Sequence, residues 1–147
     1  MAYSSEMAAA LAYQGHASAV RRPDERDAIL RIELEEWVHR GAVGRMLANL
    51  GERPARWREI LMHGIGHALR AACPLSGWHL PMLVAWKLEE MNVGEYATAA
   101  RLARDAGLEA MARELDAMSE VEWEHAVFFG GVLGFAASRG AAAPAAE

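Results

Sequence analysis

The sequence predicts an all-α fold, a bundle of long helices, and three observations carry that prediction. The 147 residues are rich in Ala, Leu, Arg, Glu and Met, which favour helices. No stretch alternates apolar and polar residues for long enough to form a strand. Glycine and proline gather at a few places that separate long uninterrupted segments. The length suits one domain with a substantial core.

Five helical segments are expected, over residues 3–20, 24–50, 55–72, 81–105 and 108–135. Asp24, which follows Pro23, is the expected N-cap of the second segment. Gly51 ends that segment and Pro54 precedes the third. Residues 73–81, which include two prolines and a glycine, are expected to form a loop, and Gly107 a short turn.

Residues 1–138 are expected to form one helical domain, followed by an Ala/Pro tail at 139–147 that is expected to be disordered.

The net charge of −5 argues against a nucleic-acid binder. The longest uncharged stretch, 71–86, is too interrupted for a membrane span. One cysteine, Cys73, excludes an internal disulfide, and the N-terminus does not resemble a secretory signal. A cytoplasmic location is expected, with attachment to the inner membrane surface as the alternative.

Acidic residues and histidines interrupt otherwise apolar helical stripes. At spacings of three and four, the second segment places Glu36 and His39 between Ile32 and Val43. The last segment carries Glu122 and His125 in the same setting. Two further stripes each contain a single carboxylate: Glu89 in the fourth segment and Glu6 in a weaker stripe of the first. Glu90 falls on a more polar side, although its position leaves open whether it replaces or joins Glu89.

Four carboxylates buried without partners would destabilise a helical core by several kcal/mol each, roughly. Two divalent cations would neutralise them, and a mixed Glu/His donor set suits iron or manganese. One Glu from each of two helices, with a Glu-x-x-His from each of two others, is the ligand pattern of ferritin-like dinuclear bundles. The predicted metal ligands are therefore Glu6, Glu36, His39, Glu89, Glu122 and His125. Two Glu-x-x-His pairs are close to chance as a count, so the argument depends on their position within apolar stripes.

The ligand order resembles that of the ferritin-like superfamily, and its spacing is most similar to the demethoxyubiquinone hydroxylases. Successive intervals are 30 residues from Glu6 to Glu36, 50 from His39 to Glu89 and 33 from Glu89 to Glu122. Local similarities are Tyr13 and Gly15 after Glu6, the run Leu88-Glu89-Glu90, and Tyr96. The chain departs from the family at Ser4-Ser5-Glu6-Met7, where the family has His-Ala-Gly-Glu-Tyr, and at Gly94-Glu95-Tyr96-Ala97, where it has a His-Tyr-Asn pattern.

This resemblance implies a four-helix bundle with an additional short apolar helix between its second and third helices. It also implies a di-iron oxygenase that hydroxylates a hydrophobic, quinone-like substrate with O2, and a manganese ion in place of one or both irons is the open variant. Glu36 with His39 and Glu122 with His125 would each serve one metal, with Glu6 and Glu89 as the remaining carboxylates. The reductant is not indicated. A ferritin-like ferroxidase or peroxide scavenger, and a metal-free helical interaction domain, are the alternatives.

The middle segment, residues 57–86, bears on the substrate and on partners. It is apolar and tryptophan-rich, with arginines near its ends. Such a segment suits peripheral contact with a membrane or the mouth of a lipophilic channel, and equally a bundle cover or a homo-oligomer interface. His63 and His67, one turn apart within it, are expected to be hydrogen-bonded histidines of the bundle rather than a second metal site. Glu33 and Glu35 are candidates to orient the ligand imidazoles.

Overall fold

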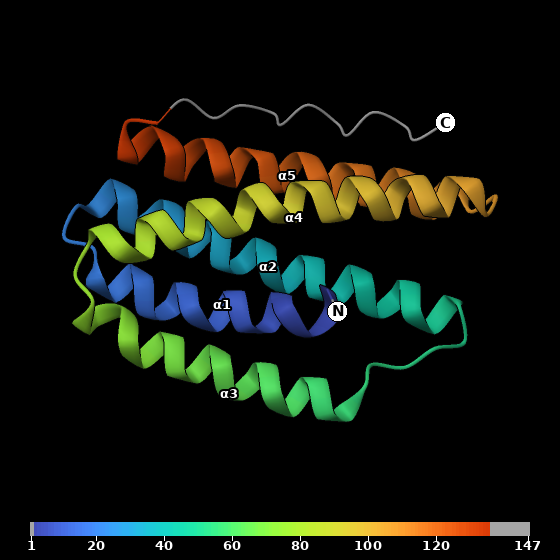
Figure 1. The fold of residues 1–147 in the computed structure, drawn as a ribbon, viewed down its shortest axis with the longest axis horizontal. Helices are drawn as coiled ribbons and strands as arrows, with labels where there is room; N and C mark the ends of the chain where they lie inside the picture. Colours follow the sequence, from blue (N-terminus) through green and yellow to red (C-terminus); the bar gives the residue numbers. More distant parts are fainter. Residues whose placement is uncertain (1, 136–147) are drawn as a thin grey trace. The chain divides into compact units, whose positions relative to one another are not determined.

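The computed structural model describes residues 2–135, and the prediction of an all-α fold is confirmed: helices cover 87% of the described residues and no strand occurs among them. The helices are α1 (Ala2–Ala19), α2 (Pro23–Asn49), α3 (Arg56–Ala72), the short 3-10 helix η1 (Cys73–Leu75), α4 (His79–Asp105) and α5 (Glu109–Leu133) (Figure 1). The predicted tail, 139–147, lies outside the described residues. The chain separates into two compact units, Met1–Pro81 and Met82–Glu147, which we describe in turn.

The predicted helix boundaries agree with the structure to within two residues, but the predicted N-cap of α2 is wrong. Asp24 is not the N-cap of α2: Arg22 holds that position with extended backbone, and Pro23 is the first helical residue. Proline suits this position because its fixed φ is helical and the missing amide would have no intrahelical acceptor. Asp24 instead lies in the first turn, paired with Arg22 at 2.8 Å. At the other end, Gly51 adopts a φ of +73° and the Glu52 amide donates to the Leu47 carbonyl at 2.8 Å, which closes α2.

The expected loop at 73–81 is largely helical, which corrects that prediction. Cys73–Leu75 forms a 3-10 turn, Gly77 supplies a φ of +78°, and α4 already begins at His79. Pro81 is therefore the third residue of α4. The first four amides of a helix have no intrahelical acceptor, so proline is tolerated there.

In the first unit, α1 packs against both α2 and α3. Its buried apolar residues, among them Met7, Ala10 and Leu11, meet a core that includes Ile29 and Ile32 of α2. The contact with α3 is a close approach of two backbones. A Cβ built on Gly66 would lie 2.9 Å from the Ala8 Cα, and one built on Gly15 would lie 2.6 Å from the Arg70 Cα. Glycine is required at both positions because any side chain would collide with backbone.

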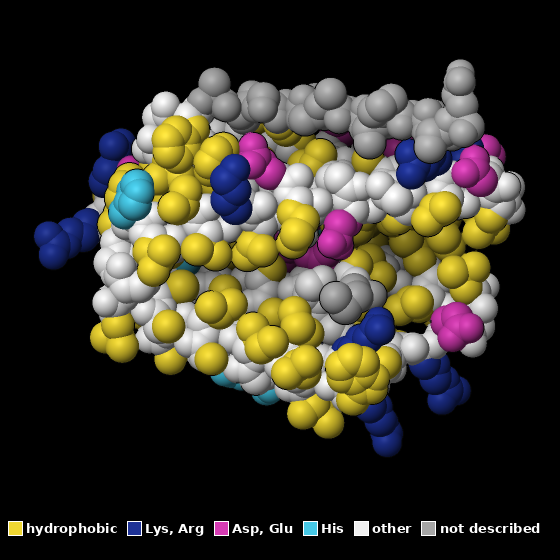
Figure 2. All heavy atoms as spheres, viewed as in Figure 1, with side chains coloured by type: hydrophobic (Ala, Val, Ile, Leu, Met, Phe, Trp, Pro, Cys, Tyr) yellow, Lys and Arg dark blue, Asp and Glu magenta, His cyan; other side chains and the backbone are white. Residues whose placement is uncertain are grey.

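Helix α3 presents its apolar side outward. Gly66 is the one residue of this helix that is buried. Large apolar side chains at spacings of three and four are exposed: Trp57, Ile60, Leu61, Ile65 and Leu69. Figure 2 shows hydrophobic side chains gathered over this helix, beside Lys and Arg side chains near its N-terminal end. The apolar periodicity of α3 therefore marks a surface rather than a core face.

In the second unit, α4 and α5 run antiparallel (Figure 1) and contact each other near both ends and in the middle. Near the start of α4, Trp86 lies against Gly130 and Phe135. Near its end, Arg104 forms an ion pair with Asp116 at 2.5 Å. Between these, the Ser119 hydroxyl donates to the Val93 carbonyl at 3.0 Å. The buried apolar residues of this pair are Met82, Ala85, Tyr96, Ala100, Ala103, Ala112, Leu115, Met118, Ala126 and Phe129. None of the described helices is long and apolar enough to cross a membrane.

Candidate metal centre

The first unit brings together three of the predicted ligands, which we call the first triad: Glu6, Glu36 and His39. Glu6 comes from α1, and the other two lie three residues apart on one face of α2. One donor atom of each lies within 4.8 Å of the others. The side chains are buried, with exposures of 3%, 0% and 4% in that order. The helical stripes predicted from the sequence thus place two carboxylates and one imidazole at one buried point.

The second unit repeats this arrangement in a second triad: Glu89 from α4 with Glu122 and His125 from α5. Their donor atoms also lie within 4.8 Å of one another, and all three residues are at most 3% exposed. His125 Nδ1 is 3.6 Å from a Glu89 carboxylate oxygen and 3.8 Å from one of Glu122. Two atoms that share an ion at ~2.1 Å lie up to about 4.2 Å apart, so both separations suit ligands of one metal.

Glu89, rather than its neighbour Glu90, faces the second triad. Glu90 instead accepts a hydrogen bond from Lys87 at 2.9 Å, one turn earlier on α4. The rotation of α4 therefore buries Glu89 beside the other donor atoms of the second triad and pairs Glu90 with Lys87.

Asn92 belongs to the surroundings of the second triad, and sequence reasoning missed it. Its amide nitrogen donates to Glu122 Oε2 at 3.3 Å. The available signal was its position three residues after Glu89, which puts both on one face of α4. The equivalent position after Glu6 in α1 is Ala9, so the two triads differ in this respect.

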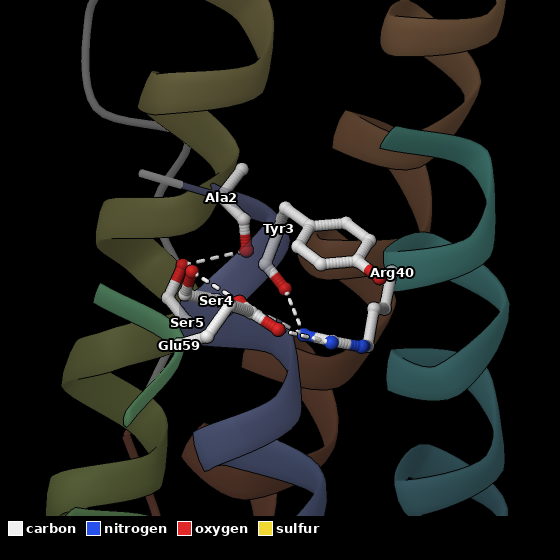
Figure 3. Close-up of polar contacts among 6 residues, drawn as sticks. All are labelled: Ala2, Tyr3, Ser4, Ser5, Arg40 and Glu59. Carbon is white, nitrogen blue, oxygen red and sulfur yellow. Dashed lines mark hydrogen bonds and ion pairs between the residues drawn. The ribbon is translucent and has the colours of Figure 1, made fainter. Parts of the chain in front are cut away.

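A polar network braces the first triad from outside (Figure 3). Arg40, which follows His39, forms an ion pair with Glu59 of α3 at 2.5 Å and donates to the Tyr3 carbonyl at 2.6 Å. Ser4, two residues before Glu6, donates to the other Glu59 oxygen. Burial by itself opposes ionisation of Glu59, but the hydrogen bonds from Arg40 and Ser4 outweigh it and hold the pKa of this carboxyl below its ordinary value. The network joins α1, α2 and α3 next to two triad residues.

Glu33, one of the two acidic residues expected to orient the imidazoles, accepts hydrogen bonds from Gln14 and Trp37. One oxygen of Glu33 accepts from Gln14 and from the Trp37 indole, at 2.9 and 2.8 Å, so this carboxylate links α1 to α2. A third buried histidine, His16, lies on α1 and contacts the Tyr13 ring. Burial lowers the pKa of His16 to about 4, so it is neutral at physiological pH.

Burial raises the pKa of the Cys73 thiol, which disfavours a reactive thiolate.

The donor chemistry of each triad fits a metal ion. Two carboxylates within a few ångströms of each other repel and are costly to bury, and a divalent cation removes both penalties. The set of two carboxylates and one imidazole is harder than the sulfur-rich sites of structural zinc and suits iron or manganese. Each triad could therefore hold a metal ion.

No protein-family model matches the chain, and no curated protein or solved structure is significantly similar to it.

Proposed function

We propose that the protein is a ferritin-like di-iron oxygenase. The observation that carries this proposal is the repetition of one donor set in the two units: a single Glu from one helix and a Glu-x-x-His pair from the other, all buried. In this proposal α1, α2, α4 and α5 are the four helices of a ferritin-like bundle, and α3 is the additional helix. The ligand pattern is the one that such dinuclear carboxylate bundles use.

The six residues have distinct roles in the proposed centre. His39 and His125 each bind one metal, together with Glu36 and Glu122 of their own helices. Glu6 and Glu89 supply the remaining carboxylates, and Asn92 orients Glu122. When bound, two ferrous ions supply the electrons and open coordination positions that O2 activation requires. The burial of all six side chains excludes water, which protects a reactive oxidant from quenching.

A hydrophobic substrate, of which a quinone is the nearest model, is supported by the surface of α3. This helix exposes Trp57, Ile60 and Leu61 next to its N-terminal arginines. An exposed apolar face with a basic margin suits a lipophilic molecule or the membrane that holds it. The same ligand set would serve a ferroxidase or peroxide scavenger without an organic substrate, so oxygen consumption with and without a lipophilic acceptor distinguishes the two activities.

Metal content is the first test. Protein purified anaerobically from iron-replete cells should contain about two irons per chain, as a dinuclear centre requires. The Glu36→Gln/Glu122→Gln double variant should lose both, because an amide is a much weaker ligand than a carboxylate. Glu89→Gln and Glu90→Gln form a matched pair on one helix, and only the first should lower the iron content. Circular dichroism verifies that each variant is folded.

The outcomes separate the alternatives. Two irons in the parent chain, lost in the double variant, support the centre and make a screen of quinones the next step. The oxygenase is supported if the iron-loaded protein consumes oxygen faster than free ferrous ion does, and does so only when a lipophilic acceptor is present. Oxygen consumption with no acceptor dependence favours the ferroxidase. Absence of bound metal from the folded parent chain overturns both and leaves a metal-free helical domain.

A further inference from the structure

Helix α3 carries two histidines that face each other on the protein surface. The Nε2 atoms of His63 and His67 lie 3.2 Å apart, and the rings meet edge to face with their centroids 4.4 Å apart. Both side chains are exposed, so they are not the histidines within the bundle that the sequence led us to expect. In the metal-free protein one ring nitrogen donates to the other, which holds the two imidazoles together.

We propose that His63 and His67 form a bidentate surface site for a divalent transition metal of the zinc, nickel and copper class. Imidazole nitrogens bind such ions at ~2.0–2.1 Å. Two nitrogens 3.2 Å apart then subtend an angle of about 100° at the metal, between the tetrahedral and octahedral values. When the ion binds, the proton of the donating ring moves from Nε2 to Nδ1 through solvent, so that both neutral imidazoles offer the lone pair of Nε2 to the metal. This site is separate from the triads and does not depend on the proposed function.

The surrounding structure organises this pair in advance. Residues four apart on a helix lie one above the other, and α3 is held in place by the close approach of Gly66, between the two histidines in sequence, to Ala8 and Leu11 of α1. Glu59, one turn before His63, is anchored by Arg40 and Ser4. A chelate whose two arms are already positioned loses less conformational entropy on binding than two free side chains would.

The donor atoms decide which metals the site takes. Two neutral imidazoles without a carboxylate prefer Cu²⁺, then Ni²⁺ and Zn²⁺, over the hard ions Mg²⁺, Ca²⁺ and Mn²⁺. Ferrous iron stands low in this series, so the surface pair does not compete with the carboxylate-rich triads for iron. Water completes the coordination because both side chains are exposed. The buried and surface donor sets therefore select different metals.

The test is a calorimetric titration of the full chain with Cu²⁺ and with Zn²⁺, in the Glu36→Gln/Glu122→Gln background so that the triads do not contribute. One ion per chain should bind, and either His63→Ala or His67→Ala should weaken the affinity at least tenfold, because each removes one arm of the chelate. His79→Gln, which changes an exposed histidine at the start of α4, is the control and should leave the affinity unchanged.

A second control keeps the number of histidines constant. The double variant His67→Ala/Ala68→His moves one imidazole to a position five residues from His63, where the two no longer face each other. Its affinity should fall to that of His67→Ala. The electron paramagnetic resonance spectrum of bound Cu²⁺ should show two nitrogen ligands in the parent and one in each single variant. Equal affinities for the parent and for His63→Ala or the shifted variant, or a copper spectrum without a second nitrogen, would overturn the proposal.

Discussion

Arg40 and Glu59 form an ion pair with a nitrogen–oxygen separation of 2.5 Å. Arg40 directly follows the triad histidine His39 in α2. Ser4 of α1 donates to the same carboxylate, so three helices of the first unit meet at Glu59. The side chains are only 15% and 25% exposed, which places the pair between a solvated surface bridge and a buried one. Through Ser4 and Arg40, Glu59 of α3 thus holds the backbone close to Glu6 and next to His39.

Glu59→Gln is expected to lower the free energy of unfolding by about 1–3 kcal/mol, because it leaves a partly buried guanidinium without its charged partner. Glu90→Gln removes the more exposed pair with Lys87 and should cost less than about 0.5 kcal/mol. Urea denaturation of the metal-free proteins at neutral pH measures both. Equal effects of the two substitutions would contradict the bracing role of Glu59.

The carboxyl of Glu59 is also expected to stabilise the folded protein by an amount that is lost in acid. The pKa of Glu59 is lower in the folded protein than its ordinary value of 4.5. The ionised form is thus favoured by folding, and its contribution is fully present above pH 4.5 and is lost as the pH falls through the folded pKa. Glu59→Gln removes a titrating group, so the difference in unfolding free energy between parent and variant should shrink below pH 4.5. A difference that stays constant down to pH 3 would contradict this.

His16 predicts a second, separate loss of stability in acid. Its pKa falls from 6.5 to about 4 on burial, so the unfolded chain binds a proton between these values and the folded chain does not. Stability is unaffected above pH 6.5 and decreases as the pH falls toward 4. The full loss is about 3 kcal/mol, at about 1.4 kcal/mol per pH unit. His16→Gln should have a flatter profile of unfolding free energy between pH 6.5 and 4, and an unchanged slope would count against a buried neutral histidine.

Two glycines in α3 predict substitutions of opposite sign. A Cβ at Gly64 meets nothing within 4 Å, so Gly64→Ala should stabilise the protein by about 0.5–1 kcal/mol through helix propensity. A Cβ at Gly66 lies 2.9 Å from the Ala8 backbone, so Gly66→Ala should destabilise it by about 1–3 kcal/mol. Thermal unfolding of the pair measures both on one helix. Stabilisation by Gly66→Ala would mean that α1 and α3 are not in close contact in solution.

Asn92→Ala is expected to weaken metal binding at the second triad by about 10–100-fold, because it removes the donor that orients Glu122. Ser119→Ala is the matched control, since it removes another hydrogen bond between α4 and α5 without touching a triad residue. Both should lower the stability of the metal-free protein by about 1 kcal/mol. Titration with Fe²⁺ or Mn²⁺ should then separate them. Equal metal affinities in the two variants would show that Asn92 serves only packing.

The sequence by itself determined the helices and the position of the chemically unusual residues within apolar stripes. Gly51 and Gly107 end helices through a positive φ, which is a local property of the backbone. The helical period alone places Glu36 and Glu122 within apolar stripes. These features depend on neighbours a few residues apart, so they are readable without a fold.

Only the tertiary structure decided which face of each helix packs and which side chains meet. Hydrophobic periodicity shows that α3 has an apolar face, but the close approach of Gly66 to α1 turns the opposite side inward. The hydrogen bond from Asn92 to Glu122 joins α4 to α5. The hydrogen bonds that Glu33 accepts come from Gln14 of α1 and from Trp37, one turn later in α2. Such contacts depend on the axial offset and rotation of one helix against another. Packing of whole surfaces sets both, and no local pattern contains them.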